Sequence, residues 1–284
     1  MPHAATGVDA GDTERSGRRH PEVRRSPSPP IPGPARKQPG RDNICLNERA
    51  DLLNLRAAGR TDCGKVRKND EDSYLVDAER GVFAVADGVG GNRGGEIASR
   101  LAVEAVVDVA SNRNGSAPEV LLEGIFAAAR AKITSSIDAE PKNEGMATTL
   151  VMLLVRDDGG WVAHCGDSRA YRWRSGKLER LTRDHSFGAE LAIAGSPYQS
   201  PFAHVLTRSL GKKESGAPDK ARVDIAGGDR YLLCCDGLTG MVPEPEIERV
   251  LGEGLSPDAT CARLIEMANA AGGLDNITAV VVDC

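Results

Sequence analysis

The sequence has no run of about 20 apolar residues, the length that a helix needs to cross a bilayer. Its N-terminus also lacks the apolar stretch of a secretory signal peptide. We therefore expect a cytoplasmic protein with no membrane span. The chain has 284 residues, of which 40% are hydrophobic, and this is enough to bury a sizeable core in one large domain.

Cysteine motifs for metal binding are absent as well. The seven cysteines are an odd number, and none of them stands in a CxxC or another zinc-type spacing. We expect them to be reduced and partly buried, because small hydrophobic thiols of this kind are typical of a reducing cytosol.

Negative charge exceeds positive charge outside the first 44 residues. Residues 1–44 carry eight Lys and Arg against five Asp and Glu, so the net charge of −5 leaves −5 − (+3) = −8 on the remainder. Nucleic acids are bound chiefly through Lys and Arg, so we expect no nucleic-acid partner. Nothing in the composition signals an oligomer, and we expect a monomer.

The N-terminal segment differs in amino-acid composition from the rest of the chain. Residues 1–44 contain eight of the sixteen prolines and two Arg-Arg pairs. Such a segment buries too little apolar surface to offset its ordering entropy, so we predict a disordered Pro/Arg-rich tail over 1–44 and one domain over 45–284. The tail is either an inert extension or a docking or phosphorylation segment, since Ser26 and Ser28 each precede a proline.

From about residue 56 onward, short β-like runs alternate with longer helical stretches. Strands are predicted over 74–76, 82–86, 148–155, 161–164, 170–173, 230–235 and 277–282. Helices are predicted over 94–111, 117–138 and 256–271, the second opening with a capping box from Ser116 to Glu119. The strands between 148 and 174 are too close for parallel crossovers. We therefore predict an α+β fold in which helices cover the outer faces of antiparallel sheets.

Aspartates recur at the ends of the apolar strands, most of them followed at once by Gly or Asn. They are Asp87, Asp167, Asp236 and Asp275. A carboxylate at the edge of a buried strand is costly unless it is paired or bound to a metal. Mg²⁺ and Mn²⁺ prefer oxygen ligands, so an aspartate set without ligand-spaced His or Cys favours them over zinc. Each Asp-Gly alone is most often a turn, but the set predicts a metal centre.

The charged segment 64–73 comes directly before a predicted strand. It is either a solvated loop or the place where Arg67 grips two phosphate oxygens with its planar guanidinium. In the second case, the neighbouring carboxylates would orient metal-bound water.

Eight strings carry a resemblance to a known family. In order they are RTDCGKVRKNDEDSYL, FAVADGVGGNRGGEIAS, MATTLV, HCGDSRAYRW, LTRDHS, VLTRSLG, LLCCDGLTGMV and GGLDNITAVVV. They resemble the successive motifs of the protein phosphatase 2C (PP2C or PPM) family of metal-dependent phosphatases, of bacterial type, over about residues 57–284. The resemblance implies an αββα four-layer sandwich, two antiparallel sheets flanked by helices. It also implies hydrolysis of phosphoserine and phosphothreonine in proteins by a binuclear metal centre with a metal-activated water as nucleophile.

The resemblance also implies a set of metal ligands. Asp87 matches the aspartate that bridges two Mn²⁺ or Mg²⁺ ions, and Gly88 matches a residue that lends its carbonyl to the first ion. Asp236 and Asp275 match ligands of the second ion. Asp167 matches the aspartate that, with Asp236, holds a weaker third ion in bacterial members.

Four further positions match residues with catalytic roles. Arg67 matches the arginine that grips phosphate, and Glu71 and Asp72 match carboxylates that hold metal-bound waters. Asn276 matches a neighbour of the last ligand. The implied partners are phosphorylated proteins, the substrates of a bacterial-type Ser/Thr kinase.

The sequence departs from the family pattern in several places. Val89 stands where eukaryotic members carry a histidine proposed as the general acid, so that acid is unassigned, and His185 is expected to be structural. Asp70 replaces the usual Asn, which either tightens metal binding or weakens phosphate approach. Residues 186–205 are rich in Gly and Pro and are expected to form a flexible lid.

Two alternatives to a protein phosphatase stay open. One is a pseudophosphatase that only recognises a phosphorylated partner, against which the intact set Asp87, Asp236 and Asp275 argues. The other is a metal-dependent hydrolase of small phosphoesters.

Overall fold

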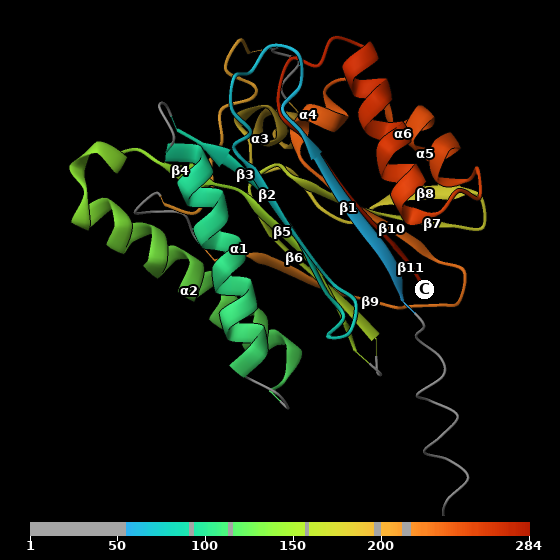
Figure 1. Cartoon of the computed structure of the whole chain (residues 1–284), viewed down its shortest axis with the longest axis horizontal. Coiled ribbons are helices and arrows are strands. Elements are labelled where there is room, and N and C mark those ends of the chain that lie inside the picture. The colour runs from blue at the N-terminus through green and yellow to red at the C-terminus, as the bar shows by residue number, and fades with distance from the viewer. Residues whose placement is uncertain (1–54, 91–93, 113–115, 157–158, 196–199, 212–216) are drawn as a thin grey trace, which may run out of the picture. The chain divides into compact units, whose positions relative to one another are not determined.

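The computed structural model describes residues 55–90, 94–112, 116–156, 159–195, 200–211 and 217–284 (Figure 1). Contacts divide the chain into residues 1–42 and 43–284. The predicted tail and Cys45 lie outside the described residues, so the tail stays a prediction. No disulfide joins the six cysteines that are described. Within these ranges no helix is both long and apolar enough for a membrane crossing.

Two antiparallel sheets form the centre of the second unit (Figure 1). The first sheet has the strand order β1 (Arg56–Asp62), β11 (Ile277–Asp283), β10 (Arg230–Cys234), β7 (Arg169–Arg174) and β8 (Lys177–Arg180). The second has the order β2 (Asp72–Asp77), β3 (Val82–Val89), β5 (Leu150–Arg156), β6 (Gly159–Cys165) and β9 (Asp219–Val223), with β4 (Ala147–Thr148) paired to β3.

Helices cover the outer faces of both sheets (Figure 1). α1 (Gly94–Asn112) and α2 (Pro118–Ala139) pack over the second sheet, and α5 (Glu244–Leu251) and α6 (Pro257–Ala270) over the first. The short elements are α3 (Phe187–Ile193), α4 (Asp236–Thr239) and the 3₁₀ turn η2 (Pro141–Asn143). The layers are therefore helix, sheet, sheet and helix, which confirms the predicted α+β sandwich.

Alternating side chains of the central strands pack on opposite faces. In β3, Val82, Ala84 and Ala86 face α1 and α2, whereas Phe83 and Val85 face the other sheet. In β11, the odd-numbered residues 277–281 pack under α6 and the even-numbered residues 280 and 282 pack between the sheets. Both faces are buried, which explains why these strands have nearly continuous apolar sequences.

All seven predicted strands and all three predicted helices are present, but the sequence did not signal several elements. They are β1, β8, β9, α3, α4 and α5. β1 reads Arg-Ala-Ala-Gly-Arg-Thr-Asp and has no apolar alternation, yet it pairs with β11 over seven residues. An edge strand can be polar because its neighbour supplies the hydrogen bonds.

The capping-box prediction for α2 was wrong. The N-cap is Ala117, it makes no side-chain cap, and Pro118 begins the helix. Glu119 accepts a hydrogen bond from Trp161 Nε1 at 3.0 Å, which turns its carboxylate toward β6. By contrast, Ser256 caps α6, since its side chain accepts from Ala259 N.

Candidate metal centre

Sheet register brings the first two acidic residues together. Asp72 begins β2 and Asp87 lies near the end of β3, and the two are direct partners in the antiparallel pair. Directly opposed residues project from the same face of a sheet. One ligand atom each of Asp72, Asp87 and Cys235 lies within 4.8 Å of the others.

The other aspartates reach the same edge from other strands. Asp236 follows β10, Asp275 precedes β11, and these two strands are antiparallel neighbours, so the end of one meets the start of the other. Asp167 follows β6 in the second sheet. These three residues and Asp87 line one cavity of about 670 Å³.

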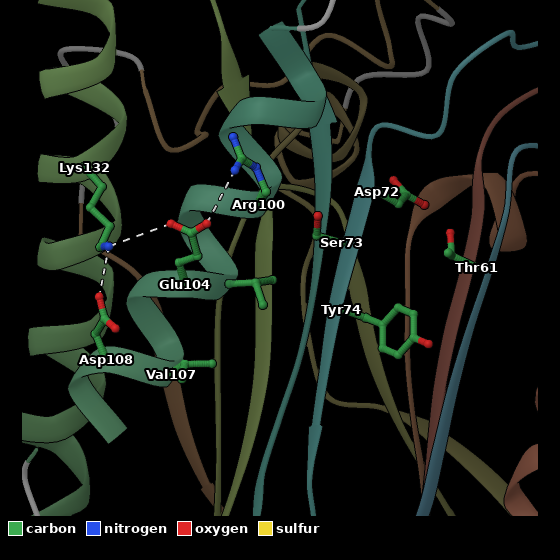
Figure 2. A pocket seen from close by; sticks show the side chains of 10 residues that line it. Thr61, Asp72, Ser73, Tyr74, Arg100, Glu104, Val107, Asp108 and Lys132 are labelled. Carbon is green, nitrogen blue, oxygen red and sulfur yellow. Dashed lines mark ion pairs between the residues drawn. The ribbon is translucent and has the colours of Figure 1, made fainter. Parts of the chain in front are cut away.

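Eight of the nine predicted site residues line this cavity, which we call the acidic cavity. They are Arg67, Glu71, Asp87, Gly88, Asp167, Asp236, Asp275 and Asn276. The ninth, Asp72, is the strand partner of Asp87 but lines a separate cavity of about 460 Å³, whose walls come from β1, β2, α1 and Lys132 of α2 (Figure 2). Thr278 Oγ1 donates to one oxygen of Asp72 at 2.6 Å, and the other oxygen is buried without a protein partner.

The electrostatics of the acidic cavity are those of an anion cluster. Burial, with the nearby carboxylates, raises the pKa of Asp72 and of Asp167 to about 7 and raises the pKa of Asp87 well above its ordinary value. Burial and the charge of Asp275 raise the pKa of Asp236 as well. These shifts mean that the fold disfavours the charged forms of these aspartates, first because the groups are buried and second because their charges repel one another.

Arg67 is the predicted phosphate-gripping residue, and it lies on the rim of the acidic cavity. Its Nη2 is 2.6 Å from Asp275 Oδ2, and about half of its side chain is exposed. One guanidinium cannot balance the five carboxyl groups that line the cavity, so their charged forms need further cations.

The glycines after two of the aspartates are required by close backbone approach. A Cβ on Gly237 would lie 2.0 Å from the carbonyl oxygen of Asn276, and one on Gly88 would lie 2.2 Å from that of Gly95. The Asp-Gly pattern therefore has a packing cause: the backbone of another segment passes directly over each glycine.

Two threonines fix the backbone of Asp87. Asp87 N donates to Thr149 Oγ1 at 2.9 Å, and Thr148 Oγ1 donates to Asp87 O at 2.8 Å. The Thr149 hydroxyl also lies 2.7 Å from that of Ser168, next to Asp167. We assigned no role to these residues from the sequence, although the string MATTLV contains both threonines.

Asn276 uses its side-chain amide to hold the loop that carries Arg67 and Glu71. Its Nδ2 donates to the carbonyls of Cys63 at 3.0 Å and Asn69 at 2.9 Å, and its Oδ1 accepts from Glu71 N at 2.9 Å. The amide therefore positions this loop against the start of β11.

Two further residues singled out in the sequence lie beside the cavity. Asp70 accepts hydrogen bonds from Thr61 Oγ1 at 2.7 Å and from Asp72 N at 3.1 Å, so both of its oxygens have partners. His185 Nδ1 accepts from Gly166 N at 3.1 Å, and its Nε2 lies 3.3 Å from Asp219. These contacts fit the structural role expected for His185.

The predicted lid contains a short helix and is closed at its base. α3 lies within it, and an isolated bridge joins Ser186 to Leu206. His204, Val205 and Leu206, at the end of this segment, also line the acidic cavity. We assigned none of these three residues to the site from the sequence, because only the fold brings them there. The flexibility of the lid stays a prediction.

The donor set fits hard divalent cations. Asp87, Asp167, Asp236, Asp275 and the Gly88 carbonyl offer oxygen atoms around one cavity. Cys235 is the nearest thiol, and burial raises its pKa well above the ordinary value, so it stays protonated. An oxygen-rich site of this kind suits Mg²⁺ or Mn²⁺ and does not suit zinc.

Comparisons with known proteins agree with this geometry. The model of the protein phosphatase 2C family matches residues 64–269. Serine/threonine protein phosphatase PstP of Mycobacterium tuberculosis is 36% identical over 238 residues, which are 81% of this chain and 45% of that protein. The chain therefore spans less than half the length of this relative. Serine/threonine phosphatase stp of Listeria monocytogenes is 33% identical over 241 residues, 81% of this chain and 96% of that protein.

Solved structures resemble the chain over the same region. The catalytic domain of serine threonine protein phosphatase PstP in complex with two manganese ions has 37% identity and a TM-score of 0.75, over 81% of this chain and 97% of that one. PppA of Pseudomonas aeruginosa has 31% identity and a TM-score of 0.73, over 82% and 98%.

Proposed function

The chain belongs to the protein phosphatase 2C family, and from this membership we propose that it hydrolyses phosphoserine and phosphothreonine in proteins with the help of Mn²⁺ or Mg²⁺. The observation that carries the proposal is the convergence of Asp87, Asp167, Asp236 and Asp275 on one cavity with Arg67 at its rim. A phosphate monoester is a dianion, so this anionic cavity needs bound cations before it can accept the substrate.

The chain's own residues have distinct parts in the proposed reaction. Asp87, Asp236, Asp275 and the Gly88 carbonyl would hold two cations, and Asp167 with Asp236 would hold a weaker third. When bound, the cations neutralise the phosphate and make water more acidic. Arg67 would orient the phosphoryl group through its planar donor fork.

The remaining predicted residues support the cavity from its edge. Glu71 would accept hydrogen bonds from waters in the acidic cavity, which orients those waters. Asp72, which we predicted for the same role, lines the separate cavity and would have to act from beside its strand partner Asp87. Asn276, which we predicted among the catalytic residues, would act by positioning the loop of Arg67 and Glu71 through the three hydrogen bonds described above.

Partners and location extend the proposal. We infer that the substrates are phosphoproteins made by a bacterial-type Ser/Thr kinase, and that the protein acts as a cytoplasmic monomer. The bacterial relatives named as Ser/Thr phosphatases support the first inference. Light scattering of the purified chain and fractionation of its host cells test the other two.

The deciding experiment measures phosphate release from a phosphothreonine peptide. We expect turnover with Mn²⁺ or Mg²⁺ and none in EDTA. Free phosphoserine and p-nitrophenyl phosphate are assayed alongside the peptide. A higher kcat/KM for free phosphoserine than for the peptide would indicate a small-phosphoester hydrolase. Tight binding of phosphoprotein with no turnover of any substrate would indicate a pseudophosphatase.

A further inference from the structure

None of the residues assigned so far donates a proton to the leaving oxygen of the substrate. When the P–O bond to serine or threonine breaks, the leaving oxygen becomes a strongly basic alkoxide unless it receives a proton. A positioned proton donor contributes about 10²–10⁴-fold to such a step. Position 89, directly after Asp87-Gly88, is a valine and supplies no proton.

The described residues that line the acidic cavity offer few proton donors. Burial acts to lower the pKa of Arg67, but the charge and hydrogen bond of Asp275 and the charges of Glu71 and Asp87 together outweigh it, so the pKa is raised and the guanidinium keeps its protons. The hydroxyls of Thr149 and Ser209 are too weakly acidic. The aspartates are the proposed cation ligands, and Glu71 is the proposed partner of waters in the cavity. His204 is the one imidazole among these lining residues, and histidine is the side chain that most often acts as a general acid.

His204 lies where it can reach a bound substrate. It lines the acidic cavity and also an adjoining cavity of about 470 Å³, and Asp167, Asp236 and Asp275 line both. His204 therefore borders both spaces together with three of the clustered aspartates. Its side chain is exposed, so solvent can return a proton to it after each turnover.

The backbone on both sides of His204 is held by α3. Phe187 N donates to Val205 O at 2.9 Å, and Gly188 N donates to Ala203 O at 2.9 Å. A Cβ on Gly188 would lie 2.9 Å from the Cβ of Ala203, so the absence of a side chain there permits this close approach. The contacts hold the backbone of the two residues that flank His204, and His204 itself lines the cavity.

We propose that His204 is a catalytic residue that protonates the leaving oxygen of the phosphorylated serine or threonine. The oxygen of a water forms a bond to phosphorus, and the bond from phosphorus to the side-chain oxygen breaks. The electron pair of the broken bond stays on the side-chain oxygen, which takes a proton from the imidazolium of His204. The neutral imidazole then regains a proton from solvent, and one proton of the attacking water is released. This inference rests on the proposed phosphatase activity.

The test compares two leaving groups in the variant His204→Gln. Nitrophenolate is a stable anion that departs without a proton, whereas the alkoxide of a phosphothreonine peptide needs one. With saturating Mn²⁺, we expect kcat for the peptide to fall by about 10²-fold or more, and kcat for p-nitrophenyl phosphate to stay close to the wild-type value. An equal loss on both substrates, or no loss on the peptide, would overturn the assignment.

A control and a second readout separate this assignment from other effects. Phe202→Ala changes an exposed residue of the same segment that does not line the cavity, and both kcat values should be unchanged. Calorimetric titration with Mn²⁺ should give the same stoichiometry for His204→Gln and the wild type, and a lost ion would instead assign His204 to metal binding and overturn the inference. A wild type that hydrolyses neither substrate overturns both proposals, whereas an active wild type with a fully active variant overturns this one alone.

Discussion

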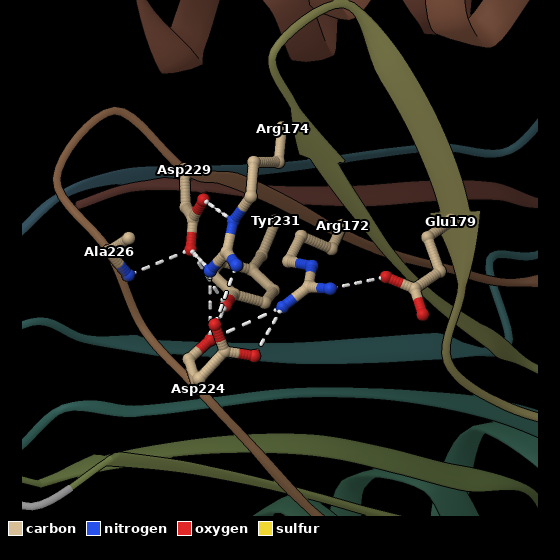
Figure 3. Close-up of polar contacts among 7 residues, drawn as sticks. All are labelled: Arg172, Arg174, Glu179, Asp224, Ala226, Asp229 and Tyr231. Atoms are coloured by element: carbon tan, nitrogen blue, oxygen red, sulfur yellow. Dashed lines mark hydrogen bonds and ion pairs between the residues drawn. The ribbon is translucent and has the colours of Figure 1, made fainter.

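Two clusters of charged side chains lie in different parts of the same sandwich, and they are built in opposite ways. The acidic cavity gathers aspartates around a single arginine. The second cluster, which we call the arginine brace, lies between β7 and the loop from β9 to β10 (Figure 3). Its members are Arg172, Arg174, Glu179, Asp224, Asp229 and Tyr231.

In the arginine brace every carboxylate has an arginine. Arg174 holds the buried Asp229 through two bonds of 2.6 Å and also contacts Asp224 at 2.6 Å. Arg172 contacts Glu179 and Asp224. The bonds from Arg174 and Arg172 lower the pKa of Asp224 to about 2. Burial alone would raise the pKa of Asp229, but the bonds from Arg174 outweigh it and lower the pKa.

The difference between the clusters shows what decides the role of a buried aspartate. Where the fold supplies arginines, the aspartate is satisfied and fastens a loop to a strand. Where it supplies almost none, the aspartates repel one another until cations arrive from solution. The first arrangement serves stability, and the second gives up stability for binding.

The largest expected effect comes from removing a charge from the acidic cavity. Asp236→Asn should lower kcat/KM by at least about 10²–10³-fold, the loss typical of one electrostatic group in a reaction centre. The same change should raise the thermal midpoint in EDTA, because the pKa of Asp236 is raised and its charged form is therefore disfavoured in the fold. Phosphate-release kinetics and thermal melts in EDTA measure the two effects.

The matched measurement adds Mn²⁺ to both proteins. The thermal midpoint of the wild type should rise with Mn²⁺, since an ion that binds only the folded state stabilises it. Asp236→Asn should show a smaller rise. A variant that melts lower than the wild type in EDTA would contradict the picture of repelling carboxylates.

Removing an arginine from the brace should lower stability and leave activity unchanged, which is the reverse of the effects expected for Asp236→Asn. Arg174→Ala leaves the carboxylate of Asp229, whose side chain is 1% exposed, without its cation. We expect a loss of about 3 kcal/mol in the free energy of unfolding and an unchanged kcat per folded molecule. Urea unfolding and active-site assays on the same samples measure both. A drop in kcat without a loss of stability would show that the two clusters are coupled.

A smaller effect depends on pH. Asp167 has a pKa of about 7 in the fold against an ordinary 3.8, so stability falls as pH rises from about 3.8 to about 7 and stays level above that. Asp167→Asn should therefore gain on the wild type by about 2 kcal/mol between pH 5 and pH 7 in EDTA, and the difference should stay constant from pH 8 upward. Comparing the two proteins cancels the titration of the histidines. A constant difference between pH 5 and pH 7 would contradict the raised pKa.

The smallest effect is expected at the exposed edge of the brace. Glu179→Gln removes one exposed partner of Arg172, which keeps its contact with Asp224. Exposed ion pairs contribute only about 0.2–1 kcal/mol, so urea unfolding should show a change within this range. A loss as large as that of Arg174→Ala would mean that the brace acts as one cooperative unit.

Much of the fold and of the site could be predicted from local patterns. Apolar strands, long helices and the aspartates that follow the strands can be recognised from a few neighbouring residues. The ordered motifs indicated the family. Polar elements such as β1 and the short helix α3 could not be predicted from their local sequence, because their stability comes from a partner strand or a neighbouring loop.

By itself the sequence determined which carboxylates stand at strand ends, because strand, turn and glycine preferences act over a few residues. Only the tertiary structure decided which of them meet. Asp72 proved to pair with Asp87 but to line a separate cavity, Asn276 to hold the loop of Arg67, and His204 to line the acidic cavity. The physical reason is that register between strands and closure of loops join positions more than 200 residues apart, and no local preference records such a contact.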